Sequence, residues 1–160
     1  MNHTPISRIL AAGSFMLLLF AAGSLYGQAQ QIQLSINPQR ISFAAADPDT
    51  SPTVSANRTV RVSIRVQGFG QRAWQLTLRA DGDLSDASST TSIDISKISW
   101  TATASPPFQG GTLVADVDQI GASGNGNVNR NSDLSFVFQN EWIYWAGSYE
   151  QTVTITLSVI

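Results

Sequence analysis

The residue types that most often carry catalysis are nearly absent from this chain. The 160-residue sequence contains no Cys, and its single His, His3, lies close to the N-terminus. Beyond that point the chain lacks the parts needed for Ser-His-Asp or Cys-His catalysis, for thiol redox chemistry, and for zinc or iron sites with His or Cys ligands. We therefore predict no enzymatic activity and no cofactor.

The glutamates offer the remaining route to catalysis. Glu141 and Glu150 are the only two in the chain, and paired carboxylates on a β-sandwich can hydrolyse glycosides. Nothing in their spacing indicates that they face each other. An enzyme would otherwise depend on Asp, Ser, Tyr or Lys97, which is the only Lys. Catalysis is therefore the least favoured functional hypothesis.

Oxygen-bearing side chains recur at alternate positions, as they do in calcium-binding loops. Asp116 and Asp118 flank a Val, and a run of alternating Asn residues leads to Asp133. An EF-hand loop that begins at Asn125 would need Gly at position 130 and Glu at position 136. The chain has Arg130 and Phe136 there, so the EF-hand pattern fails. A calcium site built from Asp116, Asp118 and Asp133 is thus a weak candidate, and a solvated loop rich in Asn and Gly is the favoured interpretation.

The segment Glu141-Trp142-Ile143-Tyr144-Trp145 concentrates aromatic side chains. Aromatic faces stack on sugar rings, so Trp142, Tyr144 and Trp145 are candidate contacts for a polysaccharide or a partner protein. The alternative is core packing. If the preceding apolar alternation continues, Trp142 and Tyr144 point inward and Trp145 points outward. We favour core packing for at least two of the three, which leaves Trp145 as the best single contact candidate.

The N-terminus has the organisation of a secretory signal peptide. Arg8 supplies positive charge, Ile9 to Phe20 form an apolar stretch, and Gly27-Gln28-Ala29 places small residues at the −3 and −1 positions of a cleavage site. The alternative is an uncleaved membrane anchor, because the apolar stretch approaches the length of a spanning helix. No basic cluster follows the stretch, which favours cleavage.

This leader sets the expected compartment and domain organisation. Residues 1–29 are predicted to be the signal peptide and residues 30–160 a single domain. We expect a secreted, periplasmic or cell-surface protein that contacts a membrane only during export. The net charge is −2, whereas proteins that bind nucleic acid usually carry an excess of positive charge. Nucleic acid is therefore not an expected partner.

Beyond the leader, apolar residues recur at every second position, which is typical of half-buried strands. The clearest example is 60–66, and no segment shows the period of a helix. A kink or bulge is expected near Ser96-Lys97, where the alternation changes phase. About seven strands are predicted, at residues 32–36, 60–66, 74–80, 93–102, 112–117, 134–138 and 153–159.

Turn-forming residues separate these strands. Two stretches, Ala44–Asn57 and Gly121–Ser132, are predicted to be irregular, because the Pro residues of the first and the Gly and Asn residues of the second suit surface loops. Short strands at this spacing predict an all-β fold, an antiparallel immunoglobulin-like β-sandwich. A small jelly roll is the alternative.

The C-terminal stretch from Ala146 to Leu157 begins Ala-Gly-Ser-Tyr and continues with Thr alternating with apolar residues. It resembles the ending of bacterial secreted sandwich domains, including spore coat protein U-like and other pilin-like subunits. The resemblance implies a structural role at the cell surface, and it implies that Tyr149 anchors a corner through a backbone hydrogen bond. Chaperone–usher fimbrial subunits commonly carry a disulfide, which this chain lacks. About seven strands would also complete the domain without a donated strand.

Two classes of function remain. The first is a structural or adhesive surface protein without catalytic activity, pilin-like, whose partner is itself or another surface subunit. Its segment Gln31–Ile36 is almost uncharged and alternating. We favour this segment as the first strand of its own sheet over a strand that pairs with a neighbouring subunit. The second class is a carbohydrate-binding module that uses Trp142, Tyr144 or Trp145.

Overall fold

The computed structural model describes residues 29–87, 90–145 and 147–160. Apart from Ala29, the predicted signal peptide of residues 1–29 lies outside the described residues, so the leader stays a prediction. Within the described part of the chain, no helix has the length and apolar character needed to cross a membrane.

Alternating apolar and polar residues form strands here because successive side chains of a strand point to opposite faces. The described residues form twelve strands and one 3-10 helix, η1 (Ile95–Lys97). Of the strands beyond the predicted ones, the strand Gln119–Asn125 has seven residues and the others have two or three each. The strands are β1 (Gln31–Asn37), β2 (Thr53–Ser55), β3 (Val60–Gln67), β4 (Ala73–Ala80), β5 (Leu84–Asp86), β6 (Ser92–Ile93), β7 (Ile98–Ala102), β8 (Gly111–Thr112), β9 (Gln119–Asn125), β10 (Val128–Gln139), β11 (Tyr149–Glu150) and β12 (Val153–Val159).

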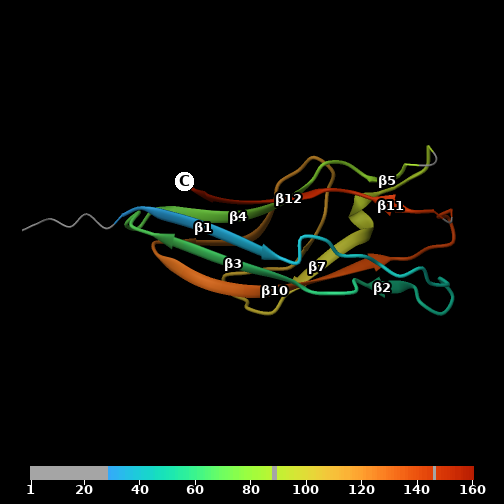
Figure 1. Cartoon of the computed structure of the whole chain (residues 1–160), viewed down its shortest axis with the longest axis horizontal. Coiled ribbons are helices and arrows are strands. Elements are labelled where there is room, and N and C mark those ends of the chain that lie inside the picture. The colour runs from blue at the N-terminus through green and yellow to red at the C-terminus, as the bar shows by residue number, and fades with distance from the viewer. Residues whose placement is uncertain (1–28, 88–89, 146) are drawn as a thin grey trace, which may run out of the picture.

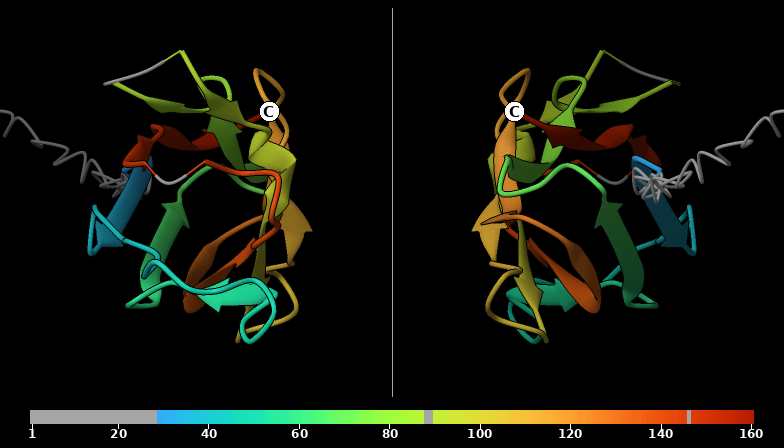
Figure 2. Two further views of the ribbon diagram at one scale, coloured as in Figure 1. Left: turned by 90° about the vertical axis from the view of Figure 1, so that its right-hand side faces the viewer. Right: turned by 90° about the vertical axis from the view of Figure 1, so that its left-hand side faces the viewer.

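Two sheets face each other and a small third sheet lies at one end of the molecule (Figure 1, Figure 2). The larger sheet has the order β1-β3-β10-β7-β8, and β2 also pairs with β10. The facing sheet has the order β12-β4-β9, and the end sheet has the order β11-β5-β6. Every pairing between these strands is antiparallel. The predicted all-β antiparallel sandwich is therefore confirmed.

The strand order follows the immunoglobulin pattern for most of its length. If β1, β3, β4, β7, β10 and β12 take the places of strands A to F, the order β1-β3-β10-β7 is A-B-E-D. The last strand, β12, then pairs with β4 as F pairs with C. No described strand lies beyond β12, in the place where strand G of an immunoglobulin domain would pair.

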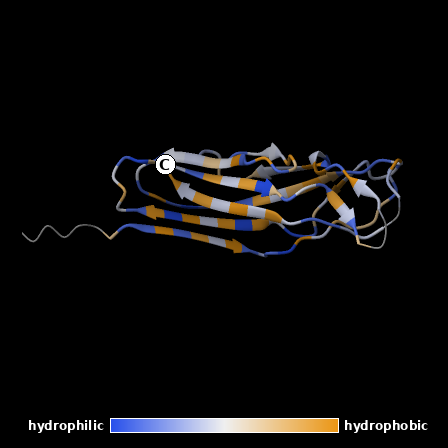
Figure 3. Ribbon diagram, turned by 90° about the horizontal axis from the view of Figure 1, so that it is seen from above, coloured by the Kyte–Doolittle hydropathy of each residue, from blue (hydrophilic) through white to orange (hydrophobic). Residues whose placement is uncertain are grey.

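The core lies between β3 and β4. The inward side chains of these two strands are almost completely buried, whereas their outward neighbours are polar and mostly accessible, which gives the strands their banded hydropathy (Figure 3). Trp100 of β7 and Phe108 close the core and are 2% and 1% exposed. The other most buried apolar side chains are Val62, Ile64, Val66, Leu76, Leu78, Ile95, Leu113 and Leu134.

The prediction of a long surface loop at Gly121–Ser132 is wrong. This stretch lies in β9 and β10, which are joined by a tight turn at Gly126 with φ of +71°. The glycines are needed for packing as well as for turning. A Cβ on Gly124 would lie 2.6 Å from Cζ2 of Trp74. The small residues therefore make room for a large aromatic side chain on the neighbouring strand β4.

Other local predictions are confirmed in part. The expected kink near Ser96-Lys97 is the 3-10 helix η1, whose N-cap Asp94 accepts a hydrogen bond from the Ser96 N–H (2.8 Å). The strand predicted at 112–117 is limited to β8. Asp116 has a φ of 59°, which ends extended backbone there. The stretch Ala44–Asn57 is irregular except for β2.

Candidate functional site

The connection between β10 and β11 carries the aromatic candidates, and we call its described residues, 140–145 and 147–148, the aromatic loop. It lies at the end of the sandwich opposite to the start of β1 (Figure 1). The Asn140 N–H donates to the Pro52 carbonyl (2.9 Å). The Asn140 side-chain amide donates to the carbonyls of Ala46 (2.9 Å) and Ser51 (3.2 Å). These bonds fix the start of the aromatic loop to the segment before β2.

Three large side chains of the aromatic loop are exposed to solvent. Trp142 is 66% exposed, Ile143 is 72% exposed and Trp145 is 78% exposed. Isolated exposed apolar residues are ordinary, but adjacent ones form a patch of the kind that often contacts a ligand or a partner. The outward orientation predicted for Trp145 is confirmed.

The inward orientation predicted for Trp142 is wrong, and so is the expectation that at least two of the three aromatic side chains pack in the core. The prediction extended the strand alternation past β10, but β10 ends at Gln139 and residues 142–144 form a turn. In this turn the Trp142 indole N–H donates to the Asp49 carboxylate at 2.9 Å. A hydrogen bond to a residue 93 positions away, and not burial, therefore orients this side chain.

The two tyrosines of this region support the loop from inside. Tyr144 points inward as predicted, and its ring lies 5.8 Å from the ring of Phe138. The Tyr149 hydroxyl donates to the Trp145 carbonyl (3.0 Å). This bond is the backbone anchor that the family resemblance implied for Tyr149. Trp145 is thus held through its backbone while its indole stays in solvent.

An ion pair lies under the aromatic loop. Lys97 Nζ and Glu141 Oε1 are 2.7 Å apart, with both side chains roughly 70% buried. The hydrogen bond to Glu141 raises the pKa of Lys97. The Tyr144 hydroxyl is buried beside this pair, and none of the described residues meets hydrogen-bond geometry with it. Burial, and then the negative charge of Glu141, raise the pKa of Tyr144 above its ordinary value of 10.0.

This environment predicts an alkaline loss of stability. A raised pKa means that the folded state holds the Tyr144 proton more tightly, so its contribution is complete below pH 10.0 and is lost as pH rises through the folded-state pKa. Phe has no hydroxyl to titrate. Above pH 10.0, the free energy of unfolding should therefore fall less with rising pH in Tyr144→Phe than in the wild type. Denaturant unfolding on both sides of pH 10.0 measures the difference, and parallel curves for the two proteins would contradict it.

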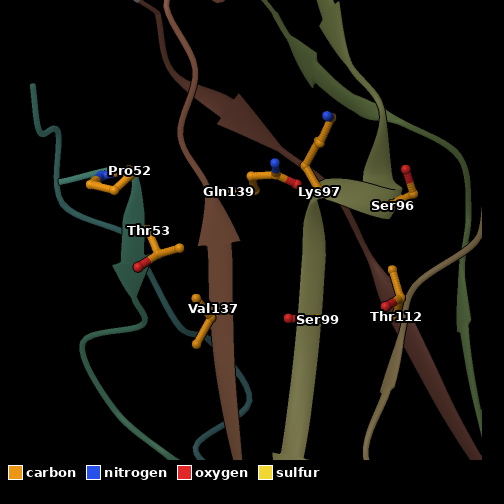
Figure 4. A pocket seen from close by; sticks show the side chains of 8 residues that line it. All are labelled: Pro52, Thr53, Ser96, Lys97, Ser99, Thr112, Val137 and Gln139. Carbon is orange, nitrogen blue, oxygen red and sulfur yellow. The ribbon is translucent and has the colours of Figure 1, made fainter. Parts of the chain in front are cut away.

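A hollow with a volume of about 370 Å³ adjoins the aromatic loop on the outer face of the larger sheet (Figure 4). Side chains of β2, β10, β7 and β8 surround it, and Lys97 stands at one end. Most of them carry hydroxyl, amide or ammonium groups, which can hydrogen-bond the hydroxyls of a sugar. The lining residues are Pro52, Thr53, Ser96, Lys97, Ser99, Thr112, Val137 and Gln139.

The three calcium candidates are not gathered into one site. Asp116 and Asp118 lie in the connection between β8 and β9, where Asp116 pairs with Arg79 at 3.2 Å. Asp133 lies on β10 of the larger sheet, in register with Arg61. In the part of the chain that is described, no group of three or more His, Asp or Glu side chains could hold a metal ion.

Comparison with known proteins adds no assignment to this geometry. No protein-family model and no curated protein sequence matches the chain.

Proposed function

We propose that this protein is a secreted or cell-surface structural subunit, without catalytic activity, that assembles with other chains through an open edge of its sandwich. The observation that carries the proposal is the pair of unpartnered edges formed by β1 and β12. β1 pairs only with β3, and β12 pairs only with β4, among the strands described. The two free edges lie beside each other, one in each main sheet.

The inner faces of these two strands are incompletely covered. Inward side chains of the central strands, such as Ile64 and Leu78, are 1% and 0% exposed. Ile32 of β1 is 46% exposed instead. The remaining inward residues of the two edge strands are all only half-buried: Leu34, Ile36, Val153, Ile155, Leu157 and Val159. An apolar row along an open side of a sandwich is the surface that an added strand would cover.

Neither edge carries the features that usually prevent strand addition. β1 reads QIQLSIN and β12 reads VTITLSV, with no charged residue and no Pro in either strand. Long edge strands in monomeric proteins are commonly protected by inward charges, Pro or bulges, because a free edge pairs readily with another chain. The bare edges therefore favour a protein that is used as an assembly subunit. The structural role implied by the pilin-like resemblance agrees with this proposal.

The test is the mass of the purified protein by size-exclusion chromatography with light scattering. We expect oligomers whose size increases with concentration. Ile32→Lys should remove the edge contact and so reduce their size, because it places a charge on the apolar row at an already exposed position. Gln33→Lys is the matched control, since it adds the same charge to the outer face of the same strand and should leave assembly unchanged. A wild-type protein that stays monomeric at every concentration would overturn the proposal.

Carbohydrate binding is the second candidate function. It is favoured by the exposed indoles of Trp142 and Trp145 and by the separate hollow lined with hydrogen-bonding groups. Trp74 and Trp100 are buried, so a change in tryptophan emission on adding a polysaccharide would report mainly on the aromatic loop. Titration with cell-wall and plant polysaccharides tests this function. A response that Trp145→Ala abolishes would support it, and no response to any glycan would count against it.

A further inference from the structure

The charged side chains are segregated along the long axis of the sandwich. Strand β10 runs the length of the larger sheet, and its twelve residues span about 40 Å at ~3.3 Å per residue. This distance is several times the screening length of about 8 Å in physiological salt. Charges at the two ends therefore act on their surroundings independently.

One end is basic. It is formed by the β3–β4 turn and the β9–β10 turn. A hydrogen bond from the Gly126 N–H to the Arg72 carbonyl (2.9 Å) connects the two turns. Arg65 is in register with Asn129 on β10, and Arg130 is in register with Ile64 on β3, so both arginines lie close to these turns. No described acidic side chain lies at this end. We define the basic end by Arg65, Arg72 and Arg130.

The opposite end is acidic. It contains the aromatic loop, the end sheet and η1, and Lys97 is the only basic side chain among them. Contacts join these parts: Asp49 binds Trp142, Asp83 accepts from the Ile95 N–H (3.1 Å), and Glu150 is in register with Ser85. We define the acidic end by its accessible carboxylates, which are Asp47, Asp49, Asp81, Asp83, Asp94, Glu141 and Glu150.

Both ends also expose apolar side chains. The acidic end presents Trp142, Ile143 and Trp145. At the basic end Ile160 is 62% exposed, and its N–H donates to the Ala73 carbonyl (2.9 Å) beside Arg72. Each end therefore combines an apolar centre with charge of one sign.

We infer that the acidic end of one copy docks on the basic end of the next copy. The charges of the two surfaces are complementary, and arginines can stack on the exposed indoles while the apolar centres exclude water. The two surfaces differ, so the contact is head-to-tail, and repeated contacts of this kind build an open filament and not a closed dimer. The inference rests on the proposed assembly function, and it adds an axial contact that is separate from the β1 and β12 edges.

Two variants that are each damaged at one end test the inference. The first carries Arg72→Glu and Arg130→Glu at the basic end, and the second carries Trp145→Ala and Glu150→Lys at the acidic end. All four residues are exposed, so both variants should unfold at the wild-type midpoint. With Ile32→Lys added to both variants to remove the edge contact, we expect sedimentation velocity to show each variant as a monomer and an equimolar mixture as a dimer, because each retains the end that the other lacks. Arg58→Glu, which changes one charge away from both ends, should assemble like the wild type.

Salt and the edge variant separate this inference from the proposed function. Wild-type head-to-tail assembly should weaken by at least about tenfold between 0.05 M and 0.5 M salt, since the screening length falls well below 10 Å. Loss of all assembly in Ile32→Lys alone, with both ends intact, would overturn the axial contact and leave the edge proposal intact. Absence of any wild-type assembly would overturn both. Monomeric wild-type protein that binds vesicles containing phosphatidylserine would assign the basic end to a membrane surface instead.

Discussion

Replacing Trp100 with Ala is expected to lower the free energy of unfolding by about 3–5 kcal/mol. The indole is 2% exposed and its N–H donates to the Gln109 carbonyl at 3.0 Å. The substitution removes the buried ring, leaves a cavity that this part of the core cannot fill, and deprives the carbonyl of its partner. Because small domains are stable by only about 5–15 kcal/mol, this single change should bring the protein close to unfolding.

A second substitution makes this prediction sharper. A Cβ on Gly111 of β8 would lie 2.5 Å from Cη2 of Trp100, so Gly111→Ala alone should cost about 1–3 kcal/mol through overpacking. In the Trp100→Ala background the same change should cost little, because the ring is gone. Denaturant unfolding of the two single variants and the double variant measures this coupling.

Ser99 provides the matched control for this experiment. It precedes Trp100 on β7, but its side chain is exposed on the outer face, so Ser99→Ala should stay within about 0.5 kcal/mol of the wild type. Additive costs for Trp100→Ala and Gly111→Ala would contradict the packing described here.

The long strands of this fold are predictable because their pattern is local. In the segment that forms β3, every second residue is apolar, and this alternation alone places its Val and Ile side chains on one face. The same reasoning predicts β4 and β12. It fails at Gly121–Ser132, because glycine allows the backbone angles of a loop and therefore predicts a loop there. The glycines of β9 are needed instead to accommodate Trp74 and Leu78 of the neighbouring strand, which no local pattern reveals.

The candidate site is less predictable because distant contacts orient its residues. Trp142 lies in solvent where Asp49 can bind its indole, and Glu141 meets Lys97 from a different segment of the chain. Neither partner can be inferred from spacing. The outward orientation of Trp145 is predicted correctly, because Trp145 lies outside the core whether β10 continues past Gln139 or a turn follows it, as it does here. The acidic and basic ends likewise arise only when the registers of both sheets are known.

Deleting residues 30–37, which contain β1, is expected to unfold the protein. Strand β3 would keep β10 on one edge but lose its partner on the other, and the side of the core around Val62, Ile64 and Val66 would be opened to water. Circular dichroism and tryptophan emission measure this loss. A deletion variant that stays folded and loses only assembly would contradict it, because β1 would then belong to a neighbouring subunit.

Moving the same segment to the C-terminus should restore the fold. β12 ends beside the start of β1, since Val159 is in register with Trp74 and Gln31 is in register with Gln67 at the same end of the sandwich. A short Gly/Ser linker after Ile160 can therefore return the segment 31–37 to its place on β3. The matched control carries Leu34→Lys and Ile36→Lys in the moved segment and should not fold, because those inward positions would place charges in the core. Recovery would show that β3 accepts this strand regardless of its connection to the chain. A second copy could then supply the strand too, which links the stability of the sandwich directly to the proposed assembly through its open side.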